Sequence, residues 1–428
     1  MTSNLTCGMA VSRLLEAYGV DTVFGIPGVH TLELYKGLGG VNIRHVQARH
    51  EQGCGFMADG YARVSGRPGV CYLITGPGVT NAATPIGQAY SDSIPLLVIS
   101  SVNATADLGM GRGRLHEITD QNAVTAPLTA FSKTAMSAAE VPNLVAAAFA
   151  VFRNGRPRPV HISLPLDVLK APAGFEAVAR VPAPPASPPE EIIEAACECV
   201  RQAKRPVVIA GGGTVDCGPG LTAFAEACGA AVILTVAAKG VMADDHPLCL
   251  GATLERGPTQ GIVASADLII AIGTELSETD SWIDRLPFNG RLIRIDIEAA
   301  ATQRDYPADI ALLGDAGRAL AAMTRRLSGH SPARAFAGDK IAKLRAKMSA
   351  ARKPLQRKHI LVLDALREAL PEDGVVCGDM TQIVYTGNYH FPCSRPRSWF
   401  FPAGYGTLGW ALPAAISAKL AAPERPVV

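Results

Sequence analysis

The pair His50-Glu51 could carry acid–base chemistry. It follows a short strand-like run at 43–46 and precedes small and apolar residues between 53 and 58. A carboxyl group just after a strand, flanked by such residues, would be poorly solvated, so its pKa would rise and it could donate a proton near neutrality. The alternative is an ordinary glutamate at a helix N-terminus, which the helix macrodipole stabilises. Spacing alone favours this second interpretation.

Three glycine-rich segments could bring backbone amides close to a ligand. They are Thr75-Gly76-Pro77-Gly78 with Asn81 soon after, Gly211-Gly212-Gly213, and 404–409. The first directly follows an apolar run, and glycines at a strand-to-helix turn permit tight backbone geometry. The second follows another apolar run but is not a GxGxxG motif, so it indicates a dinucleotide site only weakly. Taken singly, each segment predicts a structural turn equally well.

Short apolar runs alternate with alanine-rich stretches along the chain, and these must position the candidate residues. The runs are mostly continuous rather than alternating, as expected for strands buried on both faces of a parallel sheet. Alternating strands and helices predict an α/β fold with parallel sheets flanked by helices. The predicted strands lie at 70–74, 96–99, 160–162, 207–209, 232–234, 268–270 and 292–295.

Two segments interrupt this alternation and divide the chain. Residues 181–189 contain five prolines and predict an extended linker. Residues from about 328 to 358 are polar and basic, and we expect a solvated helix or connector rather than core. The predicted domains are therefore 1–180, 190–328 and 356–428, the third of which has the appearance of an incomplete domain.

Composition excludes several classes of protein. Of the 428 residues, 48% are hydrophobic, and 40 Lys and Arg against 38 Asp and Glu leave a net charge of +2. This balance provides no electrostatic basis for nucleic-acid binding. We also expect no membrane span and no signal peptide. The ten cysteines are scattered, without zinc-site or CxxC spacing, so we expect reduced thiols and a cytoplasmic protein.

The motifs become specific when they are taken together. The His-Glu pair, TGPG with Asn81, AYSDSIP at 89–95 and GYGTLGWALPAA at 404–415 occur in the order and spacing of one family. The sequence resembles the thiamine diphosphate (ThDP) enzymes of the acetolactate synthase and 2-oxo acid decarboxylase group, over essentially the whole chain. The segments VFGIPGVHTLELY, RHEQGCGFMADGYAR and GRGRLHEITDQ are most similar to 5-guanidino-2-oxopentanoate (2-ketoarginine) decarboxylases.

The resemblance implies a three-domain fold and a reaction. The predicted domains correspond to a pyrimidine-binding domain, a central domain and the first half of a diphosphate-binding domain. The implied activity is non-oxidative decarboxylation of a 2-oxo acid, in the first place 5-guanidino-2-oxopentanoate, to an aldehyde and CO₂. In this family the cofactor lies between subunits, so a homodimer or homotetramer is implied.

The resemblance also assigns roles to matching residues. Glu51 matches the glutamate that hydrogen-bonds the cofactor's aminopyrimidine ring, so that acid–base work passes through the cofactor. Val29, His30 and His116 align with positions on the substrate side, and His30 and His116 are candidate catalytic residues beside Glu51. The implied cofactor-binding residues are Glu51, Thr75, Gly76, Pro77, Asn81, Thr381, Gln382, Gly406 and Leu408.

Three departures from the family pattern matter. Relatives bind Mg²⁺ through a GDG…N segment that would begin just past Val428, so we expect no metal ligand within this chain and a truncated third domain. Position 29 is Val where acetolactate synthases usually carry Gly, and position 116 is His where they usually carry Gln. An imidazole can donate a proton near neutral pH, which would favour aldehyde formation over carboligation. Alternatively, His116 only satisfies a backbone carbonyl.

Other functions stay open at this stage. Acetolactate synthase, which joins two pyruvates, is the main alternative. A flavin or nicotinamide oxidoreductase would depend on Gly211–Gly213 alone, so FAD is possible but unsupported. A non-catalytic fragment or regulatory subunit would fit the missing metal segment.

Overall fold

A computed structural model describes residues 5–428, which form two compact units. The first unit holds the chain up to Pro184 together with Pro402–Glu424, and the second holds Pro185–Phe401 and Arg425–Val428. Both contain parallel sheets flanked by helices, which confirms the predicted α/β class. A segment from near the end of the sequence, 402–424, therefore packs with the N-terminal part of the chain.

The first unit is built on a six-stranded parallel sheet with the order β2-β1-β3-β4-β6-β5. Its strands are rich in β-branched and apolar residues, and four of them are buried along their whole length, as in a sheet covered on both faces. They are β1 (Thr22–Gly25), β2 (Arg44–Gln47), β3 (Gly69–Leu73), β4 (Leu96–Val102), β5 (Phe131–Thr134) and β6 (Val160–Pro165).

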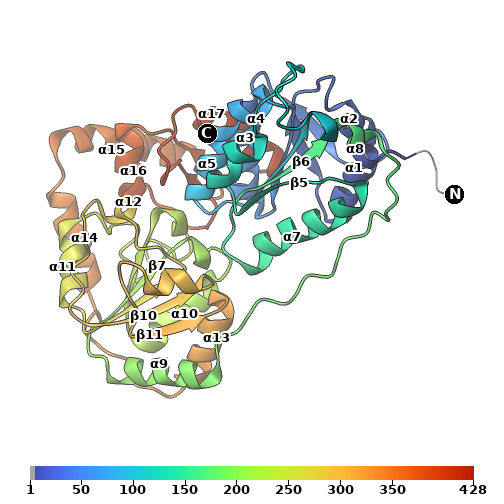
Figure 1. Cartoon of the computed structure of the whole chain (residues 1–428). Helices are drawn as coiled ribbons and strands as arrows, with labels where there is room; N and C mark the ends of the chain where they lie inside the picture. Colours follow the sequence, from blue (N-terminus) through green and yellow to red (C-terminus); the bar gives the residue numbers. More distant parts are fainter. Residues whose placement is uncertain (1–4) are drawn as a thin grey trace. The chain divides into compact units, whose positions relative to one another are not determined.

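Helices cover both faces of this sheet, and alternate strand residues point to opposite cores. On β3, Val70 and Tyr72 join one apolar cluster, whereas Cys71 and Leu73 join the other. The first core is covered by α1 (Cys7–Ala17), α2 (Leu32–Leu38), α7 (Val141–Asn154) and α8 (Leu166–Lys170). The second is covered by α3 (Glu51–Ser65), α4 (Pro77–Asn81), α5 (Ala83–Ser91) and the end of α17 (Ala411–Ala421) (Figure 1). A short helix, α6 (Gln121–Thr125), precedes β5.

The second unit contains a five-stranded parallel sheet with the order β11-β10-β9-β7-β8. One core lies between this sheet and α9 (Glu190–Gln202), α10 (Gly218–Cys228) and α13 (Ala316–Arg326). The other face is covered by α11 (Gly257–Ser265) and α14 (Lys340–Ala350), which lie side by side in Figure 1. The strands are β7 (Pro206–Ala210), β8 (Ala231–Leu234), β9 (Leu268–Ile272), β10 (Arg291–Asp296) and β11 (Ile310–Leu313).

The rest of the second unit includes α12 (Glu278–Ser281), α15 (Pro354–Ala369), α16 (Gln382–His390) and a small parallel pair, β12 (Val376–Cys377) with β13 (Trp399–Phe400). The expectation that 328–358 stays out of the core is wrong at three positions. Phe336, Ile341 and Met348 are buried in the cluster beneath α11 and α14. The charged residues of α14 concealed this burial, because only one stripe of the helix is apolar.

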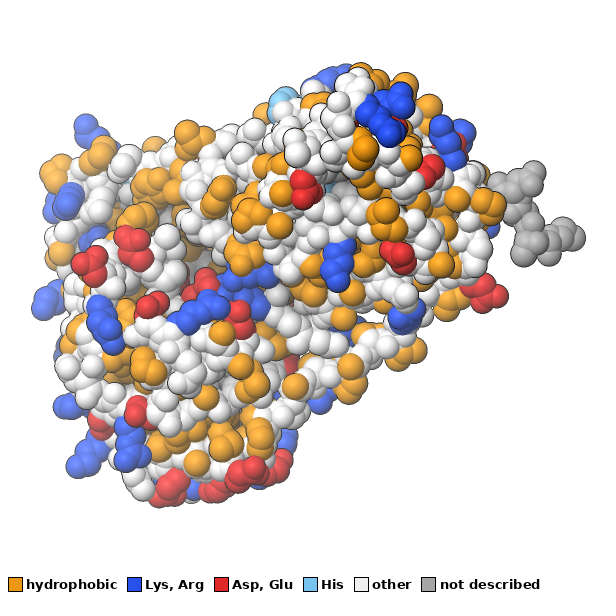
Figure 2. All heavy atoms as spheres, in the orientation of Figure 1, with side chains coloured by type: hydrophobic (Ala, Val, Ile, Leu, Met, Phe, Trp, Pro, Cys, Tyr) orange, Lys and Arg blue, Asp and Glu red, His pale blue; other side chains and the backbone are white. Residues whose placement is uncertain are grey.

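Charges of both signs are present on the face of the molecule in Figure 2. Acidic side chains gather along α9, where Arg201 donates to Glu194 at 2.9 Å. No helix within residues 5–428 is both long and apolar enough to cross a membrane.

Candidate active site

Four adjacent strands of the first unit deliver candidate residues to one edge of the sheet. In the order β2-β1-β3-β4 all strands are parallel, so their carboxyl ends share one edge. Glu51 follows β2, His30 follows β1, Thr75 follows β3 and the loop with His116 follows β4. Ligands of open α/β sheets bind at this edge. The candidate site is therefore the carboxyl edge of the six-stranded sheet.

Glu51 is the first residue of α3, and its carboxylate is held from a second loop. The side chain of His50 caps this helix by accepting the amide proton of Gln52 at 3.1 Å, which places Glu51 in the first turn. The Asn81 side-chain amide donates to Glu51 Oε2 at 2.9 Å. Pro77 begins α4 and Asn81 ends it. The TGPG turn thus brings a hydrogen-bond donor to the half-buried carboxylate.

The turn at Thr75-Gly76 is held rigidly against β4. Thr75 is fully buried, and its amide donates to Ser101 Oγ at 3.0 Å. The Gly76 amide donates to Gln121 Oε1 at 2.8 Å, while Gln121 Nε2 donates to the Ser101 carbonyl at 2.9 Å. Gly76 has φ +63°, and a Cβ there would lie 2.4 Å from the His116 carbonyl oxygen. Only glycine fits this conformation and this close approach.

Two imidazoles lie next to this turn. His30 Nδ1 is 3.0 Å from Thr75 Oγ1, and the rings of His30 and His116 have centroids 5.1 Å apart. Burial lowers the pKa of His30, and charge on His116 and Lys170 would lower it further. His116 has φ +59°, and its buried Nδ1 has no hydrogen-bond partner within residues 5–428. Val29, beside His30, is 66% exposed.

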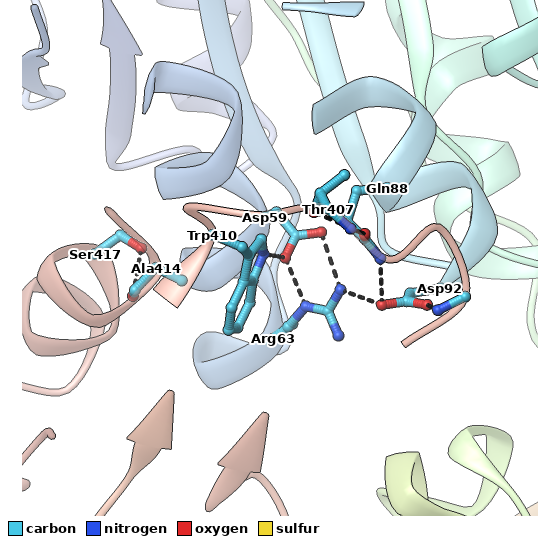
Figure 3. A network of polar contacts seen from close by, with 9 residues as sticks. Asp59, Arg63, Gln88, Asp92, Thr407, Trp410, Ala414 and Ser417 are labelled. Carbon is cyan, nitrogen blue, oxygen red and sulfur yellow. Dashed lines mark hydrogen bonds and ion pairs between the residues drawn. The ribbon is translucent and has the colours of Figure 1, made fainter. Parts of the chain in front are cut away.

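The loop that carries Gly406 and Leu408 is fastened to α3 and α5 by a buried polar network (Figure 3). The Gly404 amide donates to Asp92 Oδ1 at 2.7 Å. Thr407 donates to Gln88 Oε1 through its amide, at 3.3 Å, and through its hydroxyl, at 2.9 Å. These contacts join segments more than 300 residues apart in the sequence.

The charged centre of this network is almost completely buried. The Trp410 indole N–H donates to Asp59 Oδ1 at 2.9 Å, and both side chains have no exposed surface. Arg63 bridges Asp59, at 2.6 Å, and Asp92, at 2.7 Å. Burial raises the pKa of Asp59, whereas the Arg63 guanidinium and the Trp410 N–H oppose that rise. Removal of one partner from such a buried pair typically costs about 3–5 kcal/mol, so the network holds the loop firmly.

Close packing of α17 on α3 completes this attachment. A Cβ at Gly60 would lie 2.6 Å from the Cα of Ala414, so a larger residue would push the two helices apart. The anchored loop presents Gly406, with φ +69°, and leaves Leu408 71% exposed. A large apolar side chain held in solvent on a rigid loop is available to contact a ligand or partner.

The remaining candidates lie in the second unit. Thr381 precedes α16 and Gln382 begins it, and both are exposed a few residues after β12. The glycines at 211–213 follow β7, and a Cβ at Gly211 would lie 2.3 Å from the Gly273 carbonyl oxygen. Close approach to the loop after β9 therefore explains why glycine is needed at position 211.

Sequence reasoning assigned no role to several residues that build the site. Asp59, Gln88, Asp92, Ser101, Gln121 and Trp410 hold the two loops in place. Four of them fall inside motifs that had been singled out, such as GWALPAA and AYSDSIP. The signal in the sequence was a charged or amide residue among small residues. Its hydrogen-bond partner is known only from the tertiary structure.

Comparison with known proteins agrees with this geometry. Three domain descriptions match in order: the thiamine pyrophosphate enzyme N-terminal TPP binding domain at 5–124, the central domain at 193–323 and the C-terminal TPP binding domain at 379–428. A probable 2-ketoarginine decarboxylase of Pseudomonas aeruginosa is 56% identical over 425 residues, covering 99% of this chain and 76% of that protein. The chain belongs to the thiamine pyrophosphate enzymes.

More distant relatives in the thiamine pyrophosphate family are acetolactate synthases. The large subunit from Corynebacterium glutamicum is 32% identical over 440 residues, covering 99% of this chain and 70% of the relative. The isozyme 1 large subunit from Escherichia coli is 32% identical over 427 residues, with 98% and 75% covered. This chain is thus a ThDP-dependent enzyme, and its sequence is closer to the decarboxylase than to either synthase.

The first unit has groups that fit part of the cofactor. Glu51 offers a carboxylate oriented by Asn81, and Leu408 offers an exposed apolar surface on an anchored loop. The Asn81 donor occupies Oε2 of Glu51, which leaves lone pairs on the carboxylate for a further donor such as a ring N–H. Within residues 5–428, no cluster of three or more His, Cys, Asp or Glu side chains could hold a metal ion.

Proposed function

We propose that this enzyme removes CO₂ from a 2-oxo acid with a long basic side chain, 5-guanidino-2-oxopentanoate in the first instance, and releases the aldehyde. The observation that carries this proposal is the contrast in identity over nearly the whole chain. The sequence identity is 56% to the probable 2-ketoarginine decarboxylase and 32% to the two acetolactate synthases. The main alternative, carboligation of two pyruvates, is therefore the activity of the more distant group.

In this proposal the first unit binds and orients the pyrimidine half of ThDP. When bound, the cofactor supplies the nucleophilic carbon and accepts the electron pair released as CO₂ leaves. Glu51 would hold or exchange a proton with the aminopyrimidine ring, and Asn81 would keep its carboxylate in position. The backbone around Gly406 and the side chain of Leu408 would contact a cofactor from the anchored loop, which is fastened near the C-terminal ends of α3 and α5 and away from Glu51 at the start of α3. The other proposed contacts are Thr75, Gly76 and Pro77 in this unit, with Thr381 and Gln382 for the diphosphate.

The two imidazoles would decide the outcome on the substrate side. Decarboxylation to an aldehyde requires a proton to replace the departing carboxylate, and histidine is the side chain best suited to deliver it near neutral pH. His30 and His116 lie 5.1 Å apart between ring centroids, next to exposed Val29. The Nδ1 of His116 is buried and has no hydrogen-bond partner within residues 5–428. We propose that this pair delivers the proton that replaces the carboxylate before a second 2-oxo acid can add.

We further propose that Mg²⁺ accompanies the diphosphate, because a hard cation with oxygen ligands neutralises its charge. We also propose self-association into a homodimer or homotetramer, which the family resemblance supports. The ten cysteines are all free, and burial raises the pKa of eight of their thiols. Such thiols suit the reducing cytoplasm, which is the location that we propose.

The test is a comparison of products from two substrates. The native gene product, supplied with ThDP and Mg²⁺, is incubated separately with 5-guanidino-2-oxopentanoate and with pyruvate, and aldehyde, CO₂ and acetolactate are quantified. We expect aldehyde and CO₂ in equal amounts from the guanidino acid and little acetolactate from pyruvate. Efficient acetolactate formation, with no turnover of the guanidino acid, would instead identify a synthase.

A further inference from the structure

A short chain of hydrogen bonds runs from β4 to His30. The hydroxyl of Thr75 donates to Ser101 Oγ at 3.0 Å, and His30 Nδ1 lies 3.0 Å from the same Thr75 oxygen. Thr75 and Ser101 are both fully buried, so water does not compete for these groups. The Thr75 amide also donates to Ser101 Oγ at 3.0 Å, which makes Ser101 an acceptor in both contacts.

The direction of these bonds determines which nitrogen of His30 carries the proton. A threonine hydroxyl has one proton and two lone pairs. Because Thr75 gives its proton to Ser101, its oxygen can only accept from His30. Nδ1 of His30 must then be the protonated nitrogen, and Nε2 holds the lone pair. The hydrogen bond made by one ring nitrogen thus defines the chemistry of the other.

The surroundings keep this arrangement in place. Gln121 fastens both ends of the contact, because it accepts from the Gly76 amide at 2.8 Å and donates to the Ser101 carbonyl at 2.9 Å. The groups that bear on His30 are the His116 ring and Lys170, and together with burial they favour the neutral imidazole. A neutral ring is the state in which the choice of tautomer matters.

We propose that Ser101 is a positioning residue that acts through Thr75 to fix His30 with its proton on Nδ1, leaving Nε2 as the proton-accepting atom. This inference rests on the proposed function only for the use of Nε2 in the reaction. In that reaction His30 would take up a proton from solvent at Nε2 and deliver it from the same atom to the carbon that has lost the carboxylate, while Nδ1 stays bonded to Thr75. Free histidine in water carries its proton mainly on Nε2, so the protein reverses the ordinary preference.

The tautomer can be measured directly. The intact protein is labelled with ¹⁵N at histidine, and long-range ¹H–¹⁵N correlation spectra are recorded above neutral pH, where the two tautomers have different nitrogen shifts. The His30 signals are assigned from their loss in His30→Gln. We expect a protonated Nδ1 and an unprotonated Nε2. A His30 protonated on Nε2 in the unaltered protein would overturn the inference without any variant.

A pair of neighbouring serines supplies the matched variants. Ser101→Ala frees the Thr75 hydroxyl to donate to Nδ1, so we expect the His30 proton to move wholly or partly to Nε2. Ser100→Ala removes a hydroxyl from the preceding residue of β4, which lies 2.7 Å from His161 Nε2 and accepts from Gln121 Nε2 at 2.9 Å. Gln121 keeps its bonds to the Ser101 carbonyl and the Gly76 amide in this variant. Ser100→Ala should shift the His161 signals and leave the His30 pattern unchanged. An unchanged His30 pattern in Ser101→Ala would contradict the role of Ser101.

The spectra do not depend on catalysis, so the two proposals can fail separately. Loss of the expected product from the guanidino acid with an Nδ1-protonated His30 would remove the proposed substrate and leave the tautomer assignment standing. Formation of the expected product by a protein whose His30 is protonated on Nε2 would remove the tautomer assignment and leave the proposed substrate standing.

Discussion

Replacement of Glu51 by glutamine tests the candidate acid most directly. The amide has nearly the shape of the carboxyl group, and its oxygen can still accept from Asn81, which now donates to Oε2 at 2.9 Å. What changes is the charge and the ability to hold or release a proton. The perturbation therefore separates proton chemistry from packing at the first residue of α3.

The expected cost in stability is small. Loss of a first-turn carboxylate removes a macrodipole interaction of about 0.3–1 kcal/mol. Conversion of a charge-assisted hydrogen bond into a neutral one costs about 1 kcal/mol more. Glu51 is only half buried, so solvent reduces both contributions. We expect the free energy of unfolding to fall by less than about 2 kcal/mol, whereas loss of a proton-transfer group lowers turnover by roughly 10²–10⁴-fold.

The assay measures CO₂ release by the native gene product with saturating ThDP and Mg²⁺, and urea unfolding measures stability. Glu191→Gln is the matched control, because Glu191 is an exposed first-turn acid on α9 in the second unit. It should lower stability slightly and leave turnover unchanged. Turnover by Glu51→Gln within a few-fold of the unaltered enzyme would refute the assignment, as would an equal loss in the control.

Three further predictions follow from the buried groups around the site. Gly76→Ala places a Cβ 2.4 Å from a backbone carbonyl oxygen at φ +63°, so it should abolish turnover. Gly174→Ala has a similar φ of +64° but no atom nearer than 4.0 Å, so it should only destabilise the fold slightly. Activity assays and urea midpoints distinguish the two variants. Trp410→Phe removes the indole donor from a buried carboxylate at 2.9 Å and should cost about 1.5–3 kcal/mol in urea unfolding, while Trp282→Phe, at a side chain 54% exposed, should cost nearly nothing. Burial lowers the pKa of His161 from 6.5 to about 3. Between pH 3 and pH 6.5 this side chain is therefore protonated in the unfolded chain and neutral in the folded chain. Stability from this group is complete above pH 6.5 and should fall by about 1.4 kcal/mol for each pH unit below it; His161→Gln should flatten that slope, and an unchanged slope would show that His161 is not the group responsible.

The fold class and much of the local structure could be predicted from the chain itself. Continuous apolar runs such as 70–74 and 268–270 became β3 and β9, because strands buried on both faces need no polar alternation. The contact between Glu51 and Asn81 was not predicted, because the strands that precede them, β2 and β3, are separated in the sheet by β1. The order of the motifs along the chain identified the family without any knowledge of the contacts between them.

The sequence by itself therefore determined the α/β fold and the family, because apolar runs and motifs can each be recognised from residues close together in the chain. It also supplied the candidate groups of the site as predictions. Only the tertiary structure decided what holds those groups. The hydrogen bond between Trp410 and Asp59 joins positions 351 residues apart. The hydrogen bond between Thr75, just after β3, and Ser101, on β4, is completely buried. The spacing of apolar residues in the sequence predicts which residues are buried. It does not predict which buried hydrogen-bond donor pairs with which acceptor. That pairing is settled when the sheet and helices pack, because each enclosed polar atom must then find its partner inside the protein.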